Sequence, residues 1–215
     1  MAYPTVSAPY GLKPVNLIGG QVFAGQTREL PITTSSVNYS TAIYNGDVVA
    51  ITSSGTVIKS ALAADSSPLA GTIGIFVGAS YTNPSTNQKI FTQSWPGFAS
   101  GVTDAVAYIV DDPDALFKVA SVGATADSTG LTVTALAQTV LGNNVALVQN
   151  TGKSTTGDSK EGVYASTGST TTLPFRVIAG VPETVNASGS FTEVIVKFNF
   201  GVHTYYSATA VATAA

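Results

Sequence analysis

The chain has 215 residues, no cysteine and a single histidine, and its nine Lys and Arg against twelve Asp and Glu give a net charge of -3. Charged residues make up 10% of the chain, whereas a typical soluble protein has about 25%. There is no basic excess to form the positive face of a nucleic-acid binder. The lack of cysteine excludes disulfides, zinc–thiolate sites and thiol catalysis, and one histidine excludes multi-histidine metal sites.

The composition predicts an all-β protein. Thr, Val, Tyr, Phe and Ile favour strands, strong helix formers are few, and there are 21 glycines for turns. The chain is long enough to bury a core without covalent staples. No stretch offers the roughly 20 apolar residues of a spanning helix, and the N-terminus lacks the basic and apolar regions of a signal peptide. We therefore expect no membrane partner and synthesis in a cytoplasm.

Residues 1–35 are predicted to form an extended N-terminal arm. Prolines at positions 4, 9 and 14 fix the backbone and remove hydrogen-bond donors, which disfavours the interior of a sheet. Large apolar side chains accompany them, so an arm that lies on a partner is one interpretation and a strand packed on its own domain is the other. The candidate partner contacts are Tyr3, Val6, Tyr10 and Leu12.

Residues 36–122 are predicted to form a β-barrel-like or sandwich-like core. Turn residues alternate with apolar runs, and strands are expected at residues 48–51, 56–58, 72–78, 89–95, 105–110 and 116–122. In residues 72–78, Ile73, Ile75 and Val77 would share one face. The paired Gly74 and Gly78 indicate close approach of another backbone or of an aromatic ring.

The second half of the chain is expected to be looser at first and then to return to strands. Residues 123–172 are rich in Ser, Thr and Gly and are predicted to be a loop-rich insertion, with a short helix over 132–141 and a weak hairpin around Val163. Residues 173–215 are expected to complete the β core with strands at 173–178 and 193–200, followed by a frayed tail.

Several segments together resemble structural proteins of tailed-bacteriophage virions, most of all head decoration (cement) proteins. The resemblance covers nearly the whole chain, although each piece is a weak motif of turn and strand residues. The pieces are residues 9–15 and 19–20, 46–49, 71–78, 95, 107–113, 142–144, 157–159, 173–177, 193–199 and 203.

This resemblance implies a β-rich protein seated on the outside of an icosahedral shell, often as a homotrimer. The implied partner is the major capsid protein, and the implied role is to bridge neighbouring capsid subunits and stabilise the shell. The expected location is the capsid exterior of a virion assembled in the host cytoplasm. A tail-fibre module that binds a receptor or carbohydrate is the alternative, although no repeat or stalk pattern is visible.

The sequence offers few candidates for chemistry, and we expect no enzyme activity and no cofactor. Asp111, Asp112 and Asp114 could supply oxygen ligands to a hard cation, but acidic residues around a proline are also what tight turns use. His203 lacks a recognisable nucleophile partner and is predicted to be a structural or interface residue. Trp95 is either an aromatic platform for a sugar or an anchor of the core.

Overall fold

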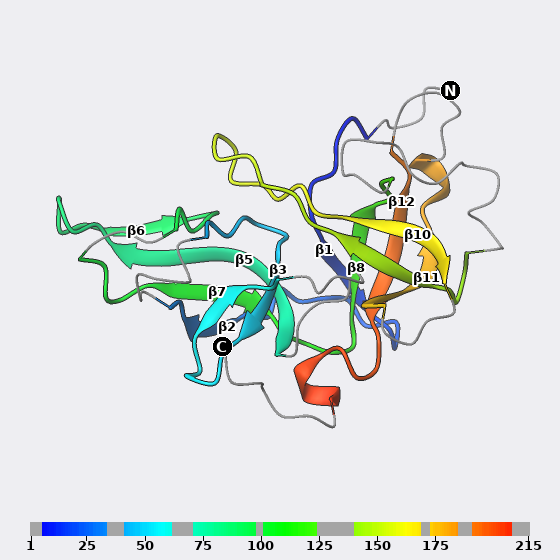
Figure 1. Cartoon of the computed structure of the whole chain (residues 1–215), viewed down its shortest axis with the longest axis horizontal. Coiled ribbons are helices and arrows are strands. Elements are labelled where there is room, and N and C mark those ends of the chain that lie inside the picture. The colour runs from blue at the N-terminus through cyan, green and yellow to red at the C-terminus, as the bar shows by residue number, and fades with distance from the viewer. Residues whose placement is uncertain are drawn as a thin grey trace.

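The fold is nearly all β, as predicted from the composition. The computed structural model describes residues 6–33, 41–61, 71–97, 101–123, 140–168, 173–184 and 191–207. Within these ranges the strands form two antiparallel sheets packed as a sandwich-like core (Figure 1). Two short 3-10 helices, η1 (Pro182–Thr184) and η2 (Thr204–Tyr206), complete the secondary structure of the described ranges. None of their helical segments has the length and hydropathy that crossing a membrane requires.

One sheet joins the N-terminal strand to the C-terminal half of the chain. Its order is β1-β8-β12-β11-β9-β10, and it lies on the right of Figure 1. Its strands are β1 (Lys13–Leu17), β8 (Ala115–Ala120), β9 (Asn144–Val148), β10 (Gly162–Gly168), β11 (Phe175–Gly180) and β12 (Glu193–Phe198).

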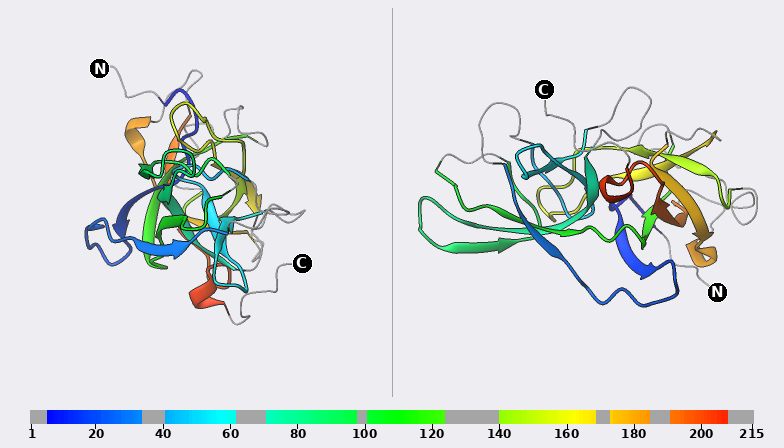
Figure 2. Two further views of the ribbon diagram at one scale, coloured as in Figure 1. Left: turned by 90° about the vertical axis from the view of Figure 1, so that its left-hand side faces the viewer. Right: turned by 90° about the horizontal axis from the view of Figure 1, so that it is seen from below.

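The other sheet is built from the middle of the chain. Its order is β2-β7-β5-β3-β4, and β6 also pairs with β5. Its strands are β2 (Arg28–Pro31), β3 (Val48–Ile51), β4 (Val57–Lys59), β5 (Thr72–Thr82), β6 (Lys89–Thr92) and β7 (Val106–Val110). The hairpin of β5 and β6 projects to the far left of Figure 1. The β1–β2 connection crosses between the two sheets at the surface, as the blue segment of Figure 2 shows.

The hydrophobic core has two main parts, one for each sheet. The part under the first sheet is built on Phe117, Phe175 and Phe198, and side chains of the second sheet, such as Val48 and Ile75, also enter it. The part under the second sheet contains Trp95, which is edge-on to Tyr81 with ring centroids 5.2 Å apart. Because Val48 and Ile75 pack with the aromatic residues of the other sheet, the sheets share a continuous core where they meet.

The structure confirms most of the strands predicted in the first half of the chain, and in residues 123–172 it shows a hairpin that includes Val163, where the sequence indicated a weak one. That stretch contributes β9 and β10, which pair with each other as a hairpin, and β9 also pairs with β11. Val145, Leu147 and Val163 are fully buried, so a short apolar run inside a polar stretch was enough to form a strand. The helix expected over 132–141 falls almost entirely outside the described residues.

The N-terminal segment packs on its own chain from residue 6 onward. Val6 forms an isolated antiparallel bridge with Phe191, and β1 pairs with β8 through a register that shifts between Pro14 and Asn16. Leu12 is completely buried in the core of the first sheet. Of the two interpretations of this segment, the packed strand describes residues 6–17.

Replacing Leu12 with alanine should therefore destabilise the fold. Deletion of a buried leucine side chain leaves a cavity and typically costs about 2–5 kcal/mol, so we expect a loss of that size in the free energy of unfolding by urea. Ile18→Ala is the matched control, because Ile18 is 48% exposed and surface changes usually stay within about 0.5 kcal/mol. Equal and small effects of the two substitutions would contradict this placement of the N-terminal segment.

Candidate functional site

Three charged side chains are buried together where the two sheets meet. Asp47 precedes β3 and Lys59 ends β4, both in the second sheet, whereas Glu161 precedes β10 of the first sheet. The two carboxylates are completely shielded from solvent, and the Lys59 side chain is 12% exposed. Burial of charge is costly unless each group is paired and hydrogen-bonded, so the contacts of this cluster decide whether it is tolerated.

The Asp47 carboxylate receives three donors. Its Oδ2 accepts from Lys59 Nζ at 2.9 Å and from the Tyr44 backbone N–H at 2.9 Å. Its Oδ1 accepts from Ser159 Oγ at 2.5 Å, and that serine oxygen accepts in turn from the Glu161 N–H at 2.9 Å. Groups from both sheets thus converge on one carboxylate.

The Glu161 carboxylate is bound in a similar way. Its Oε2 accepts from the Val48 N–H at 2.8 Å, and its Oε1 accepts from Gln149 Nε2 at 3.0 Å. Lys59 Nζ lies 3.4 Å from Oε1. Lys59 therefore contacts both carboxylates, and a hollow of about 360 Å³ lined by Lys59, Tyr44 and Gln149 leads from it to the surface.

Two carboxylates share one lysine, and this arrangement shifts the pKa values of Glu161 and Lys59. Burial, together with the nearby Asp47 charge, raises the pKa of Glu161 to about 8. Burial lowers the pKa of Lys59, but the carboxylates of Glu161 and Asp47 outweigh it and hold that pKa above its usual value. Glu161 therefore carries a proton at neutral pH while Lys59 stays charged.

Tight backbone contact brings the segments of this cluster together. The Leu12 N–H donates to the Gly46 carbonyl at 2.9 Å, and the Gly11 N–H donates to the Glu161 carbonyl at 3.1 Å. Gly11 and Gly46 have φ of +80° and +97°, and a Cβ on Gly11 would lie 2.8 Å from the Gly46 oxygen. Both positions therefore need glycine for space and for backbone conformation.

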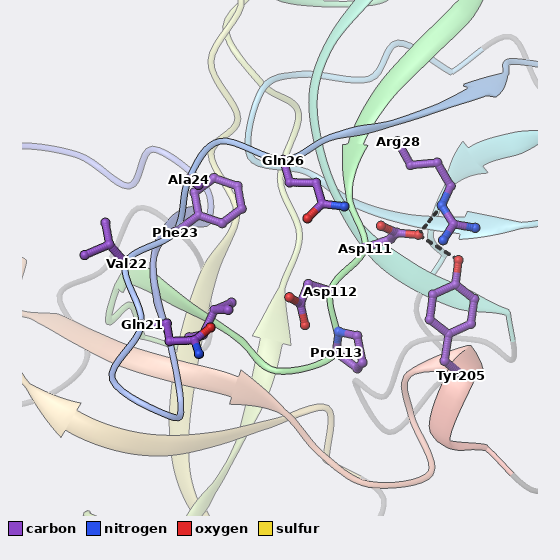
Figure 3. Close-up of a pocket in the computed structure, with 11 residues that line it drawn as sticks. Gln21, Val22, Phe23, Ala24, Gln26, Arg28, Asp111, Asp112, Pro113 and Tyr205 are labelled. Atoms are coloured by element: carbon purple, nitrogen blue, oxygen red, sulfur yellow. Dashed lines mark hydrogen bonds and ion pairs between the residues drawn. The ribbon is translucent and has the colours of Figure 1, made fainter.

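A second site is a groove of about 470 Å³ between the β1–β2 connection, the 111–113 turn and η2 (Figure 3). Asp111 lies between Arg28 and Tyr205: Arg28 Nε is 2.8 Å from Asp111 Oδ2, and the Tyr205 hydroxyl donates to the same oxygen at 2.7 Å. Gln21, Gln26 and other side chains of the β1–β2 connection line the opposite wall. The groove offers amides, a carboxylate and an aromatic ring for polar recognition.

The acidic cluster at residues 111–114 is distributed over separate partners. Asp112 Oδ1 accepts from the Asp114 N–H at 2.8 Å, which is the hydrogen bond of an Asx turn. Asp114 pairs with Lys197 at 2.6 Å, and Asp111 binds Arg28 and Tyr205. Among the described residues, no group of three or more His, Cys, Asp or Glu is arranged to hold a metal ion.

His203 and Trp95 are both buried, each at 1% exposure. His203 caps η2, where its Nδ1 accepts from the Tyr205 N–H at 3.2 Å, and its ring lies edge-on to Phe198. Burial lowers its pKa, so the imidazole is neutral. Trp95 is an anchor of the core, and its burial rules out the exposed sugar platform that the sequence left open.

The four candidate partner residues of the N-terminus have different surroundings. Tyr3 lies outside the described residues. Val6 and Tyr10 are partly buried against Ala120, Val122 and Phe191, and the Tyr10 hydroxyl donates to Glu193. Burial raises the pKa of that hydroxyl well above its usual range. Leu12 lies wholly inside the chain, so its side chain offers no surface to a partner.

Among the described residues, three large hydrophobic side chains are much more exposed than the others. Phe91 on β6 is 73% exposed, Val22 in the β1–β2 connection is 77% exposed, and Phe200 after β12 is 84% exposed. Phe200 also stacks on Tyr206 at 6.3 Å between ring centroids. These side chains are the apolar groups that a partner could cover.

Sequence reasoning missed the buried charge cluster. Asp47 belongs to a turn pattern in the sequence, and no pattern singles out Lys59 or Glu161. The only sequence feature related to the cluster is the pair of glycines, Gly11 and Gly46, that allows the two segments to approach each other. Local sequence patterns do not show that these segments meet, because the contact joins distant parts of the chain.

Comparisons of the chain with protein-family models, with curated proteins and with solved structures give no significant match.

The buried cluster predicts that the free energy of unfolding declines as the pH rises from about 4.5 to about 8. Between the usual pKa of 4.5 and about 8, folded Glu161 keeps a proton that the unfolded chain has lost. The contribution of this proton to the free energy of unfolding is therefore complete below about pH 4.5 and is lost as the pH rises through about 8. The free energy of unfolding falls by at most about 1.4 kcal/mol per pH unit in this range. Urea unfolding measured from pH 6 to 9 should show this decline.

Glu161→Gln should flatten that pH dependence, whatever it does to stability at a single pH. Lys89→Gln is the control, because Lys89 belongs to an exposed pair with Asp104 and should leave the slope unchanged. A slope that survives in the Glu161 variant would show that another group titrates.

Proposed function

We propose that the chain is a structural virion protein that binds the outer surface of a phage capsid and bridges neighbouring major capsid subunits. The resemblance to head decoration proteins supports the proposal, as do the all-β fold and the low charge. A sparsely charged surface is a solubility liability for a free monomer and suits a protein covered by neighbours. The protein would act by binding, with no chemical step.

The observation that carries the proposal is where the exposed hydrophobic side chains lie. Phe91 sits on the hairpin that projects at one end of the long axis, whereas Phe200 follows β12 of the other sheet near η2 (Figure 1). A single exposed apolar residue is ordinary. Exposed aromatic residues on β6 and in the turn after β12 give the molecule two separated contact regions, which is the requirement for bridging.

The mechanism follows from linkage. A protein that binds only the closed lattice stabilises that lattice by its binding free energy. Symmetry multiplies a modest contact, because a homotrimer at a three-fold position engages three equivalent sites and gains avidity. Strand edges add a second mode of contact: β6 pairs with β5 on one side and, among the described residues, with no strand on the other, so it could accept a strand from a capsid subunit.

The groove of Figure 3 favours the alternative function, a receptor-binding or carbohydrate-binding virion module. Its amides, carboxylate and tyrosine are the kinds of group that hold a sugar by hydrogen bonds and ring contact. The two functions differ in the number of copies per virion, which quantitative electrophoresis of purified particles measures. Decoration requires copies in proportion to the capsid subunits, whereas a fibre module is present in few copies.

Polar substitutions at the two exposed phenylalanines test the decoration proposal. Phe91→Ser and Phe200→Ser should each weaken attachment to undecorated particles about tenfold or more, because covering a phenylalanine contributes about 1.5–3 kcal/mol. Thermal stability should change little, since both side chains are exposed in the free protein. Pelleting of particles with bound protein measures the affinity.

Gln88→Ser on the same hairpin is the control, because Gln88 is exposed and polar. It should bind as the unsubstituted chain does. Full occupancy by both phenylalanine variants would contradict the contact regions proposed here.

A further inference from the structure

The buried cluster has the composition and arrangement needed for a covalent bond between two side chains. Lys59 supplies an amine, Asp47 supplies a carboxyl group 2.9 Å away, and Glu161 is a second carboxyl group 3.4 Å from the same nitrogen. These groups have no role in the proposed capsid contact, because the two acids are completely buried. We propose that Lys59 Nζ and the Asp47 carboxyl condense to an intramolecular amide (isopeptide) bond, with Glu161 as the proton shuttle.

Placement removes most of the barrier that such a reaction has in water. The amine and the carboxyl are held in hydrogen-bond contact by a short hairpin, in which Val49 pairs with Lys59. Fixed proximity of this kind is equivalent to very high effective concentrations of the reactants. Exclusion of water also favours neutral over charged forms, and the amide replaces a buried ion pair whose desolvation is costly.

The protons held by the three side chains are in the places that the reaction needs. Glu161 is protonated at neutral pH, so transfer of one proton from Lys59 to Asp47 along their 2.9 Å hydrogen bond gives an amine and two carboxylic acids. The ion pair is the major form, because the pKa of Lys59 is raised, and the reaction proceeds through the minor neutral form. No oxidant or other co-reactant is needed.

The step balances as a condensation. The Nζ lone pair attacks Asp47 Cγ, and the Ser159 hydroxyl, 2.5 Å from Oδ1, stabilises the negative charge that develops on that oxygen. Glu161 gives its proton to the departing Oδ2 hydroxyl and takes one from the nitrogen, so it ends as it began. The C–O bond breaks, the C–N bond forms, and one water molecule leaves, for which the hollow beside Lys59 is the exit.

The chain contains a matched internal control. Lys89 and Asp104 form a pair with the same 2.9 Å separation, but their side chains are more than 40% exposed. The exposed pair is solvated, and among the described residues no second acid forms an ion pair with Lys89, so Lys89 should stay unmodified. Comparing Lys59 with Lys89 shows whether burial and the presence of Glu161 are needed for bond formation, or whether a separation of 2.9 Å is enough.

Mass spectrometry of the denatured full-length protein tests the proposal directly. We expect the chain to be lighter than its sequence by one water molecule. Trypsin should fail to cut after Lys59, so residues 29–89 should appear as one peptide that lacks one water, while cleavage after Lys89 proceeds. A full-mass chain that yields separate peptides 29–59 and 60–89 would overturn the proposal, and this measurement needs no variant.

Two substitutions assign the reacting groups. Lys59→Arg keeps the charge but removes the reactive amine, and the variant should have its full mass. Loss of water in that variant would point to dehydration elsewhere and would overturn the proposal. Glu161→Gln keeps the size of the side chain without its acidity, although its amide NH2 replaces one of the two accepting oxygens. The variant should leave most of the protein unlinked, and bond formation as complete as in the unsubstituted chain would overturn the role of Glu161.

Discussion

The structure depends on two acids and one lysine that are buried where the two sheets meet. Buried ionisable groups need hydrogen-bond partners, and residues near both sheets supply them. The donors that satisfy Asp47 and Glu161 come from backbone and side-chain groups of both sheets, among them Tyr44, Val48, Gln149 and Ser159. Removing one member of the cluster while the others stay buried would leave a charged group without its partner, which costs about 3–5 kcal/mol. The cluster therefore couples the two halves of the molecule.

Because the cluster joins the two sheets, it also connects the two regions that carry the exposed hydrophobic side chains. Val48, which donates to Glu161, also packs in the core of the other sheet, so the joint is held by polar and apolar contacts at once. Phe91 lies on β6 of the second sheet and Phe200 closely follows β12 of the first sheet, so a load applied between them would cross this joint. A protein that bridges two capsid subunits needs such a rigid path, and a covalent bond from Lys59 to Asp47 would strengthen it on the side of β3 and β4.

The extent to which the sequence predicts this fold differs from one element to the next. Alternation and turn residues located β3, β7 and β12 to within about two residues, because their apolar runs are long and bounded by turns. The glycines of β5 also indicated the close approaches that occur: a Cβ on Gly74 would lie 2.1 Å from the Val110 oxygen, and one on Gly78 would lie 3.1 Å from the Thr92 oxygen. Both signals are local.

The features that the sequence did not predict depend on contacts between distant segments. Strict alternation along β5 fails at Ile73, because the pairing with β3 shifts there: Val49 pairs with Gly74, whereas Ala50 pairs with Thr72. Ile73 therefore packs in one part of the core and Ile75 in the other. The sequence indicated a weak hairpin around Val163, but it did not indicate that β9 would also pair with β11. Asp47 and Glu161 are 114 residues apart in the sequence, and the residues around each of them do not indicate that the two acids are buried together.

Amide hydrogen exchange at Val48 tests most directly whether the buried cluster is the structural centre of the molecule. Its N–H donates to Glu161 Oε2 at 2.8 Å, across the joint between the sheets. If the joint holds the fold together, this amide exchanges only when the whole chain unfolds, with a free energy equal to that of global unfolding. Exchange at the much lower free energy of a surface loop, while the amides of β8 and β12 stay protected, would show that the joint opens independently and would contradict the account.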